Sequence, residues 1–321
     1  MNRTDKASHG KEPGPFKSSA DAENGLKMDA GKLPGRPLLV GLMGQGIQES
    51  RTPAMHMAEG ARLGMNLSYQ LLDIDLMKDR FDPETIIAAA EICGFAGINV
   101  THPYKMAAWA LVDDLSPDAE MIGTINAIVF RNGKRYGYNT DFWGFRESFR
   151  RNMADAVCGK VVLLGAGGAG SAVAHALADC GVKSLFIFDQ DSARAHELAN
   201  KLTKNKSSVQ AVPLSSVNDI EKIKADGIVN ASPVGMCSYP GLPLPESLIR
   251  PGLWVADIVY FPLETALLRH ARNTGCRVLT GERMAIMQAY RSFELFTGIT
   301  SDAEKMTAVF QRLGKPASIE R

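Results

Sequence analysis

The chain has 321 residues, with 36 Lys plus Arg against 35 Asp plus Glu, and 45% of its residues are hydrophobic. This is an ordinary globular composition with room for two domains, and its balanced charge gives no overall field to attract a polyanion, so we expect no nucleic-acid partner. The five cysteines are scattered without CxxC spacing and the six histidines include no HExxH pair, so we expect neither a disulfide framework nor a metal site.

The first 35 residues are polar and rich in Lys, Ser and Gly, without an apolar core of signal-peptide length. We expect residues 1–35 to form a disordered tail. No apolar run approaches the length that spans a membrane, so we expect no membrane partner and a cytoplasmic location.

From residue 38, short apolar runs alternate with helical stretches, which is typical of a mostly parallel sheet with crossover helices. We expect strands at 38–43, 67–74 and 98–100, and helices at 53–63, at 83–93 and from Pro103. Asp82 and Thr52 have the residue type and position of helix N-caps. Asn132-Gly133, between two strand-like runs, predicts a hairpin and an antiparallel edge.

A second series of strands and helices follows in the same alternation. Its expected strands are 161–164, 185–188, 209–212, 227–230, 254–259 and 277–279, with helices from Gly168 and from Ser192. Ser301 with Glu304 forms a capping box for the last helix, which we expect Gly314 and Pro316 to stop. The proline-rich loop 233–251 is long enough to border a ligand site.

A glycine loop opens this second series. Gly165, Gly167 and Gly170 satisfy GxGxxG directly after a strand and at a helix start, which favours a tight turn that brings pyrophosphate to backbone N–H donors. Asp189 ends the next strand, where a carboxylate would bind both ribose hydroxyls and repel a 2′-phosphate, so NAD is preferred over NADP. Arg194 is able to accommodate that phosphate, although a solvated helix position is the simpler interpretation.

Lys105 and Asp141 are the candidate catalytic groups. Lys105 ends NVTHPYK at a helix start, and Asp141 ends YNTD as the expected cap of a helix at 142–153. The two groups are able to hold and deliver one proton, although an ordinary surface salt bridge is the alternative. A polar pocket is favoured by the uncharged residues around them, namely Asn99, Thr101, Asn126, Asn139 and Thr140. With a dinucleotide loop, this set suggests proton and hydride transfer at a hydroxyl group.

Ser50 and Thr52 are hydroxyls in a loop after an apolar strand, where they are able to bind a polar ligand. Helix capping accounts for Thr52 equally well, and Ser50 has no evident structural role.

Eight segments in fixed order resemble the shikimate dehydrogenase family, and most closely its NAD-dependent quinate/shikimate dehydrogenase branch. They are GQGIQESRTPAMH, GINVTHPYK, GTINAI, GYNTDFWGF, GAGGAG, NASPVGM, DIVYFPLET and GERMAIMQA, and the resemblance as a whole covers residues 38–313. The resemblance implies an α/β fold in which a Rossmann-type doubly wound parallel sheet, residues 142–281, joins a second α/β substrate domain with a mostly parallel sheet. That substrate domain would be discontinuous, comprising 36–141 and 282–321.

The resemblance also implies roles for individual residues. Lys105 and Asp141 would be the catalytic pair at the C3 hydroxyl of a cyclohexane carboxylate. Substrate would contact Ser50, Thr52, Thr101, Asn126, Thr140, Tyr260 and Gln288, the last of which is otherwise only a polar helix residue. NAD would contact Gly165, Ala166, Gly167, Gly168, Ala169, Gly170, Asp189, Arg194, Ser232, Val259 and Gly281.

Two departures from the common biosynthetic form matter. Thr52 stands where that form usually has a second serine, and Asp189 stands where NADP-dependent members typically have Asn-Arg-Thr. Both point to NAD-dependent interconversion of the C3 alcohol and ketone of quinate or shikimate, in a monomer or homodimer that serves quinate catabolism as well as aromatic biosynthesis. The alternatives are an aminoshikimate-type dehydrogenase and a catalytically silent NAD-binding regulator.

Overall fold

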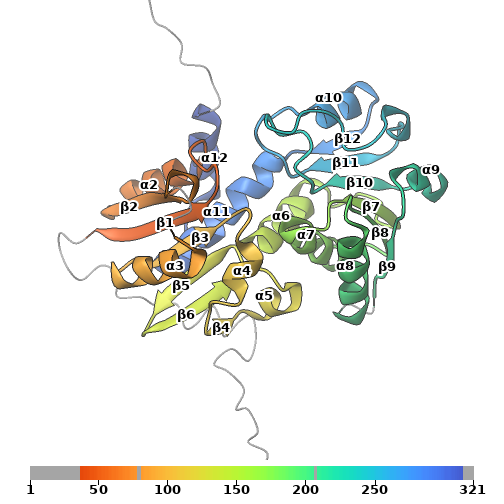
Figure 1. Ribbon diagram of the computed structural model, residues 1–321. Helices are drawn as coiled ribbons and strands as arrows, with labels where there is room; N and C mark the ends of the chain where they lie inside the picture. Colours follow the sequence, from red (N-terminus) through yellow and green to blue (C-terminus); the bar gives the residue numbers. More distant parts are fainter. Residues whose placement is uncertain (1–36, 78–80, 206–207, 314–321) are drawn as a thin grey trace, which may run out of the picture.

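The computed structural model describes residues 37–77, 81–205 and 208–313, so the predicted tail 1–35 and the predicted helix stop at Gly314 and Pro316 lie outside it. Two six-stranded sheets lie side by side, each flanked by helices, and the helices α6 and α11 run between them (Figure 1). The predicted α/β class is confirmed.

The first sheet has the order β2-β1-β3-β5-β6-β4. Its strands are β1 (Leu38–Gly44), β2 (Leu67–Asp73), β3 (Gly97–Val100), β4 (Asp114–Leu115), β5 (Ala127–Arg131) and β6 (Lys134–Tyr138). β1 is parallel to β2 and β3, whereas β5 is antiparallel to β3 and β6. Asn132 and Gly133 have φ of 53° and 68°, the primed turn that the hairpin requires. The hairpin is confirmed, but the short parallel β4 lies outside it at the edge.

Helices flank this sheet, and two of them, α11 and α12, come from the end of the chain. They are α2 (Thr52–Arg62), η1 (Asp75–Met77), α3 (Pro83–Ile92), α4 (Lys105–Trp109), α5 (Pro117–Ile122), α11 (Gly281–Thr297) and α12 (Ala303–Arg312). Asp82 caps α3 as predicted, since its side chain accepts a hydrogen bond from the Thr85 amide at 2.8 Å.

Four predictions about helix starts were wrong because a neighbouring residue takes the terminal position. Thr52 does not cap α2, because the helix begins at Thr52 and Arg51 precedes it. α4 begins at Lys105 and not at Pro103, since the Tyr104 amide closes a turn on the Thr101 carbonyl at 2.9 Å. Asn139 caps α6 in place of Asp141, and Asp302 caps α12 in place of Ser301.

The second sheet is entirely parallel, with the order β12-β11-β10-β7-β8-β9. Its strands are β7 (Lys160–Leu164), β8 (Ser184–Phe188), β9 (Gln210–Pro213), β10 (Gly227–Asn230), β11 (Trp254–Asp257) and β12 (Arg277–Leu279). β11 ends two residues before the predicted limit at 259, because the Val259 amide donates to the Asp257 side chain. The strand order reverses between β7 and β10, which is the doubly wound Rossmann pattern with a ligand crevice at the switch point.

Helices cover both faces of this sheet and bury its apolar strands. They are α7 (Gly168–Asp179), α8 (Ser192–Asn205), η2 (Val217–Asp219), α9 (Ile220–Ile223), η3 (Glu246–Leu248) and α10 (Ala266–Asn273). α7 is buried along most of its length, since small alanines let it pack closely against the central strand β7.

The two halves meet where α6 (Thr140–Asn152) crosses α11. A Cβ on Gly144 would lie 2.9 Å from the Gln288 amide nitrogen and 3.0 Å from the Met284 carbonyl oxygen, so glycine is what permits this close crossing. The domain division at 141/142 and 281/282 stays a prediction, with the change of sheet between β6 and β7 in its favour.

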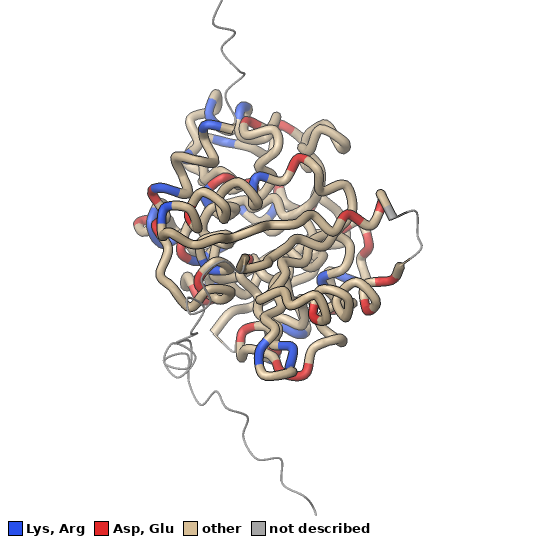
Figure 2. The backbone as a smooth tube through the Cα atoms, turned by 90° about the vertical axis from the view of Figure 1, so that its left-hand side faces the viewer, with Lys and Arg blue, Asp and Glu red and all other residues tan. Residues whose placement is uncertain are grey.

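Basic and acidic residues are interspersed along the backbone in the view of Figure 2. Within the described ranges, no helix is long and apolar enough to cross a membrane. Nor does any group of three His, Cys, Asp or Glu side chains in those ranges have an arrangement that would hold a metal ion.

Candidate active site

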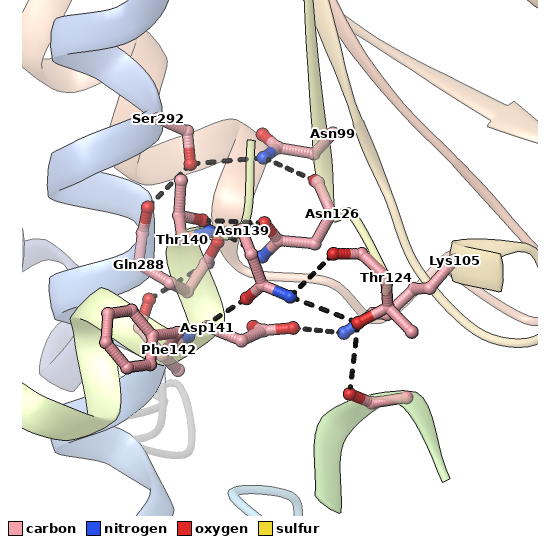
Figure 3. A network of polar contacts seen from close by, with 12 residues as sticks. Asn99, Lys105, Thr124, Asn126, Asn139, Thr140, Asp141, Phe142, Gln288 and Ser292 are labelled. Atoms are coloured by element: carbon pink, nitrogen blue, oxygen red, sulfur yellow. Dashed lines mark hydrogen bonds and ion pairs between the residues drawn. The ribbon is translucent and has the colours of Figure 1, made fainter. Parts of the chain in front are cut away.

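Lys105 and Asp141 form an ion pair between the two sheets. Lys105 is the first residue of α4 and Asp141 the second residue of α6, and the Lys105 Nζ is in direct contact with the Asp141 Oδ2 (Figure 3). The side chains are 16% and 10% exposed, so this is not a surface salt bridge. The pair is largely enclosed and still reachable from solvent, as a proton-transfer group must be.

Amide and hydroxyl side chains hold the Asp141 end of the pair. The Thr140 amide donates to Asn126 Oδ1 at 2.6 Å, and Asn126 Nδ2 donates to Thr140 Oγ1 at 2.9 Å. Asn139 caps α6 by accepting from the Phe142 amide at 3.0 Å, and its Nδ2 donates to the Thr124 carbonyl at 2.9 Å. The start of α6 is thereby fixed to the segment before β5.

A buried network behind the pair joins the sheet to α11. Asn99 Nδ2 donates to the Asn126 carbonyl at 3.2 Å and to Ser292 Oγ at 3.1 Å, and the Ser292 hydroxyl donates to the Gln288 carbonyl at 2.5 Å (Figure 3). Asn99 Oδ1 accepts from the Tyr69 hydroxyl at 3.0 Å. Gln288 is half-buried on α11, four residues before Ser292, and its Nε2 donates to the Ala285 carbonyl at 3.0 Å.

Tyr260 lies after β11 and approaches the site from the other sheet. Burial raises the pKa of the Tyr260 phenol, the Asp141 carboxylate raises it further, and the Arg51 guanidinium opposes both. Arg51 separates Ser50 from Thr52, and its Cζ lies 4.6 Å from the centroid of the Phe310 ring. The charges of Asp141 and of Arg51, which lies between the two hydroxyl residues, therefore both act on this phenol.

The other predicted substrate contacts lie on loops at the strand ends. Ser50 Oγ accepts from the Thr52 amide at 3.4 Å, so Ser50 has the local structural role that the sequence did not reveal. Thr52 is buried at the start of α2, and Thr101 follows β3 with its methyl group against Gly44. No hydrogen bond links these three side chains to the Lys105–Asp141 pair within the described residues.

The glycine loop lies directly beside Lys105. Gly165 follows β7 with φ of 102°, and a Cβ on Gly170 would lie 2.1 Å from the Gly165 carbonyl oxygen, so both positions need glycine. A Cβ on Gly167 would meet no atom within 4 Å, which leaves open space before α7. A Cβ on Gly168 would lie 3.5 Å from the Cβ of Lys105. Open space in front of a helix start fits a pyrophosphate, because the first N–H groups of a helix have no partner within the helix.

The carboxylate of Asp189 reaches back to this loop. Its Oδ2 accepts from the Ala166 amide at 2.6 Å, and its Oδ1 accepts from the Asp191 amide at 2.9 Å. Carboxylate oxygens have lone pairs left for ribose hydroxyls. Arg194 pairs with Asp191 at 3.3 Å and its side chain is 62% exposed, in keeping with the solvated helix position.

The remaining predicted cofactor residues lie at the carboxyl ends of β10 and β11 and at the start of α11. The Ser232 hydroxyl donates to Asn230 Oδ1 at 2.7 Å, and the Val259 amide donates to Asp257 Oδ1 at 3.0 Å. A Cβ on Gly281 would lie 2.5 Å from the Val259 carbonyl oxygen. Ala169 is in the first turn of α7. Ala169, Ser232, Val259 and Gly281 follow the carboxyl ends of β7, β10, β11 and β12, the end of a parallel sheet at which the switch-point rule expects a ligand.

The structure therefore joins Lys105 to Asp141 and Asn126 to Thr140, four residues that the sequence analysis placed around one polar pocket. It also adds contacts that the sequence analysis missed. Thr124 donates to the Gly168 carbonyl at 3.5 Å and links the two halves, and Ser292 holds Asn99. A signal existed for Ser292, because it lies four residues after Gln288 on the same helix face.

Comparison with known proteins agrees with this geometry. Residues 42–128 match the model of the shikimate dehydrogenase substrate binding domain, and residues 139–223 match the model of the ThiF family. A shikimate dehydrogenase (NADP(+)) of Streptomyces avermitilis is 44% identical over 286 residues, covering 88% of this chain and 97% of the relative. A quinate/shikimate dehydrogenase (NAD(+)) of Corynebacterium efficiens is 42% identical over 282 residues, covering 86% and 98%.

The solved structures show the same likeness. The structure of quinate dehydrogenase from Corynebacterium glutamicum in complex with NAD superposes with a TM-score of 0.81 at 40% identity, covering 86% of this chain and all of that one. Fold and sequence thus agree over nearly the whole described chain. The chain belongs to the shikimate dehydrogenase family.

Proposed function

We propose that this protein is an NAD-dependent dehydrogenase that interconverts the alcohol and ketone at C3 of quinate or shikimate. The observation that carries the proposal is the enclosed Lys105–Asp141 pair, placed against the start of the glycine-loop helix α7. The similar proteins are named as dehydrogenases of shikimate or quinate, and they align with nearly all of the described chain, which supports this substrate class.

The ion pair manages the hydroxyl proton. In the oxidative direction the C3 hydroxyl gives its proton to the pair as the C3–H electron pair departs with its hydrogen, and a C=O bond forms. In the reductive direction Lys105 returns a proton to the ketone oxygen while Asp141 holds the ammonium in place. NAD, when bound, supplies the acceptor or donor of the hydride.

The other site residues orient the ring in this proposal. Ser50 and Thr52 would bind the substrate carboxylate, with Thr101 and Tyr260 beside them. Asn126, Thr140 and Gln288 would bind ring hydroxyls. The fixed hydrogen bonds of Asn126 and Thr140 support this, because preorganised donors and acceptors lose little entropy when they bind substrate.

Asp189 supports NAD over NADP in this chain. Similar proteins divide between the two cofactors, so similarity alone does not choose. The Asp189 carboxylate lies beside the loop that would hold the pyrophosphate, where it would accept bonds from ribose hydroxyls and repel a 2′-phosphate. The proposal includes the contacts of the glycine loop, Ser232, Val259 and Gly281 with the cofactor.

Turnover of quinate and shikimate, each with NAD and with NADP, tests the proposal by absorbance of the reduced cofactor. We expect activity with NAD, and Lys105→Met is expected to lower kcat by a factor of about 10²–10⁴, as for loss of a general acid–base. Lys134→Met is the matched control, because that lysine is on the hairpin, 3.5 Å from Asp114, away from the site. No turnover with either acid, or full activity of Lys105→Met, would reject the proposal.

Two smaller proposals have tests of their own. We propose a monomer or homodimer, which light scattering measures, and a cytoplasmic location, which cell fractionation measures.

A further inference from the structure

A buried carboxylate holds the loop that leads to Ser50 and Thr52. Asp73 is the last residue of β2, is only 3% exposed, and pairs in register with Gly44, the last residue of β1. The loop from β1 to α2 starts at this point. Asp73 thus lies at the carboxyl end of β2, beside β1, which leads into the loop that contains the two hydroxyl residues.

Four donors converge on this carboxylate. Oδ1 accepts from the amides of Gly46 at 3.2 Å and Asp75 at 3.3 Å. Oδ2 accepts from the Ile47 amide at 3.3 Å and from Gln48 Nε2 at 2.8 Å. Among the described residues no Lys, Arg or His forms an ion pair with Asp73. Hydrogen bonds to these N–H donors therefore stabilise its charge in place of a counter-ion.

A short series of hydrogen bonds connects this loop to the Ser50 and Thr52 hydroxyls. Ile47 is buried, and its carbonyl accepts from the Ser50 amide at 3.0 Å. Ser50 Oγ then accepts from the Thr52 amide at 3.4 Å. The Gln45 amide donates to the His102 carbonyl at 3.1 Å, which ties the loop to the segment before Lys105. A shift at Asp73 would therefore move the Ser50 hydroxyl.

We propose that Asp73 is a positioning residue that sets the Ser50 and Thr52 hydroxyls against the substrate carboxylate. The inference rests on the proposed function, since it assigns the carboxylate end of that substrate to this segment. Asp73 acts through the loop and does not touch the reacting carbon. An asparagine at 73 keeps one acceptor oxygen but turns an N–H donor toward either Gly46 or Ile47, whose amide then has no acceptor.

Asp73→Asn is the direct test. We expect the KM for shikimate and quinate to rise roughly tenfold, the factor that corresponds to about 1.4 kcal/mol, while the KM for NAD changes less than about twofold. Asp82→Asn is the matched control, because that carboxylate also accepts from a backbone amide, at 2.8 Å from Thr85, but lies exposed at the cap of α3. The control is expected to keep wild-type constants.

The methyl ester of shikimate separates positioning from general damage. It lacks the negative charge that the hydroxyls would bind, so the wild type is expected to prefer the acid and Asp73→Asn to lose most of that preference. In a Ser50→Ala/Thr52→Val background, Asp73→Asn is expected to add less than about twofold to KM, since coupled residues are not additive. Equal losses for acid and ester, or an additive effect in that background, would overturn the inference.

Gln48→Leu provides a milder perturbation if Asp73→Asn does not fold. It removes one donor, and we expect about a threefold rise in the KM for the acid with the same loss of preference over the ester. An unchanged KM and an unchanged preference in this folded variant would also overturn the inference. A wild type without turnover rejects the proposed function itself, whereas normal wild-type turnover with unaffected variants rejects the role of Asp73 alone.

Discussion

Replacing His56 by Leu is expected to make the protein more resistant to acid. The imidazole is fully buried in α2, with its ring centroid 5.0 Å from that of Tyr69 in an edge-on arrangement and 5.7 Å from that of Phe293. Burial lowers the pKa of His56 from 6.5 to about 3, and within the described residues neither ring nitrogen has a hydrogen-bond partner that would stabilise the imidazolium. The folded protein therefore holds this side chain neutral in mildly acidic solution.

The sign of the effect follows from proton binding. Between pH 6.5 and pH 3 the unfolded chain binds a proton at His56 that the folded chain does not, so stability falls as the pH drops through this window. At about 1.4 kcal/mol per pKa unit, going from pH 7.5 to pH 5 costs the wild type about 2 kcal/mol at this residue. Leucine does not titrate and has a similar volume, so the variant lacks this loss.

Urea unfolding at pH 7.5 and pH 5 measures the effect in both proteins. The difference between the two pH values is the quantity to compare, because any constant change in packing then cancels. His196→Leu is the control, since it removes an exposed imidazole from α8. If the wild type and His56→Leu lose the same stability to within about 0.5 kcal/mol, the size of an ordinary surface substitution, the reasoning about buried His56 is refuted.

Further predictions concern the cofactor half. Burial raises the pKa of Asp257 from 3.8 to about 6, so between these pH values the folded state retains a proton that the unfolded state releases. The stability that this residue contributes is therefore lost as the pH rises through that window. Asp257→Asn is expected to remove a gain of about 1 kcal/mol in the free energy of unfolding at pH 5, measured in the same urea assay. An unchanged pH dependence would contradict this. Gly170→Ala is expected to lower Tm and raise the KM for NAD, because the added Cβ would lie 2.1 Å from a backbone oxygen. Gly167→Ala is expected to raise the KM for NAD at unchanged Tm, because its added Cβ would meet no atom of the protein within 4 Å. Equal Tm losses in the two variants would refute the view that close packing requires glycine at Gly170 but not at Gly167.

Local patterns predicted the elements because each depends on its own residues. The run of apolar residues before Gly165 is a buried strand of the parallel sheet, and Asn132-Gly133 forms the hairpin because both residues adopt positive φ. The glycine loop was recognisable for the same reason, since tight turn, helix start and acidic residue all lie within one supersecondary unit. Lys105 and Asp141 were recognisable as candidates from their residue types and positions at helix starts, whereas their direct contact, across 36 residues, depends on the fold.

Helix caps were mispredicted where two suitable residues are close together. Asn139 and Asp141 both suit the start of α6, and Ser301 and Asp302 both suit the start of α12. Propensity ranks these residues as near equals, so tertiary contacts decide between them. Asn139 caps because its amide also bonds the Thr124 carbonyl, and this frees Asp141 to face Lys105.

Contacts between distant segments were beyond a local reading, and these are the ones that complete the site. Gly46 and Asp73 are 27 residues apart, and Asn99 and Ser292 are 193 apart. Each contact depends on which strands are neighbours, and strand order is not encoded in any one strand. Once β1 lies between β2 and β3, the carboxyl end of β2 must lie beside the loop after β1. A buried acid at a strand end next to a ligand loop is then a candidate positioning residue on topology alone, because free loop amides need an acceptor and the strand end supplies one.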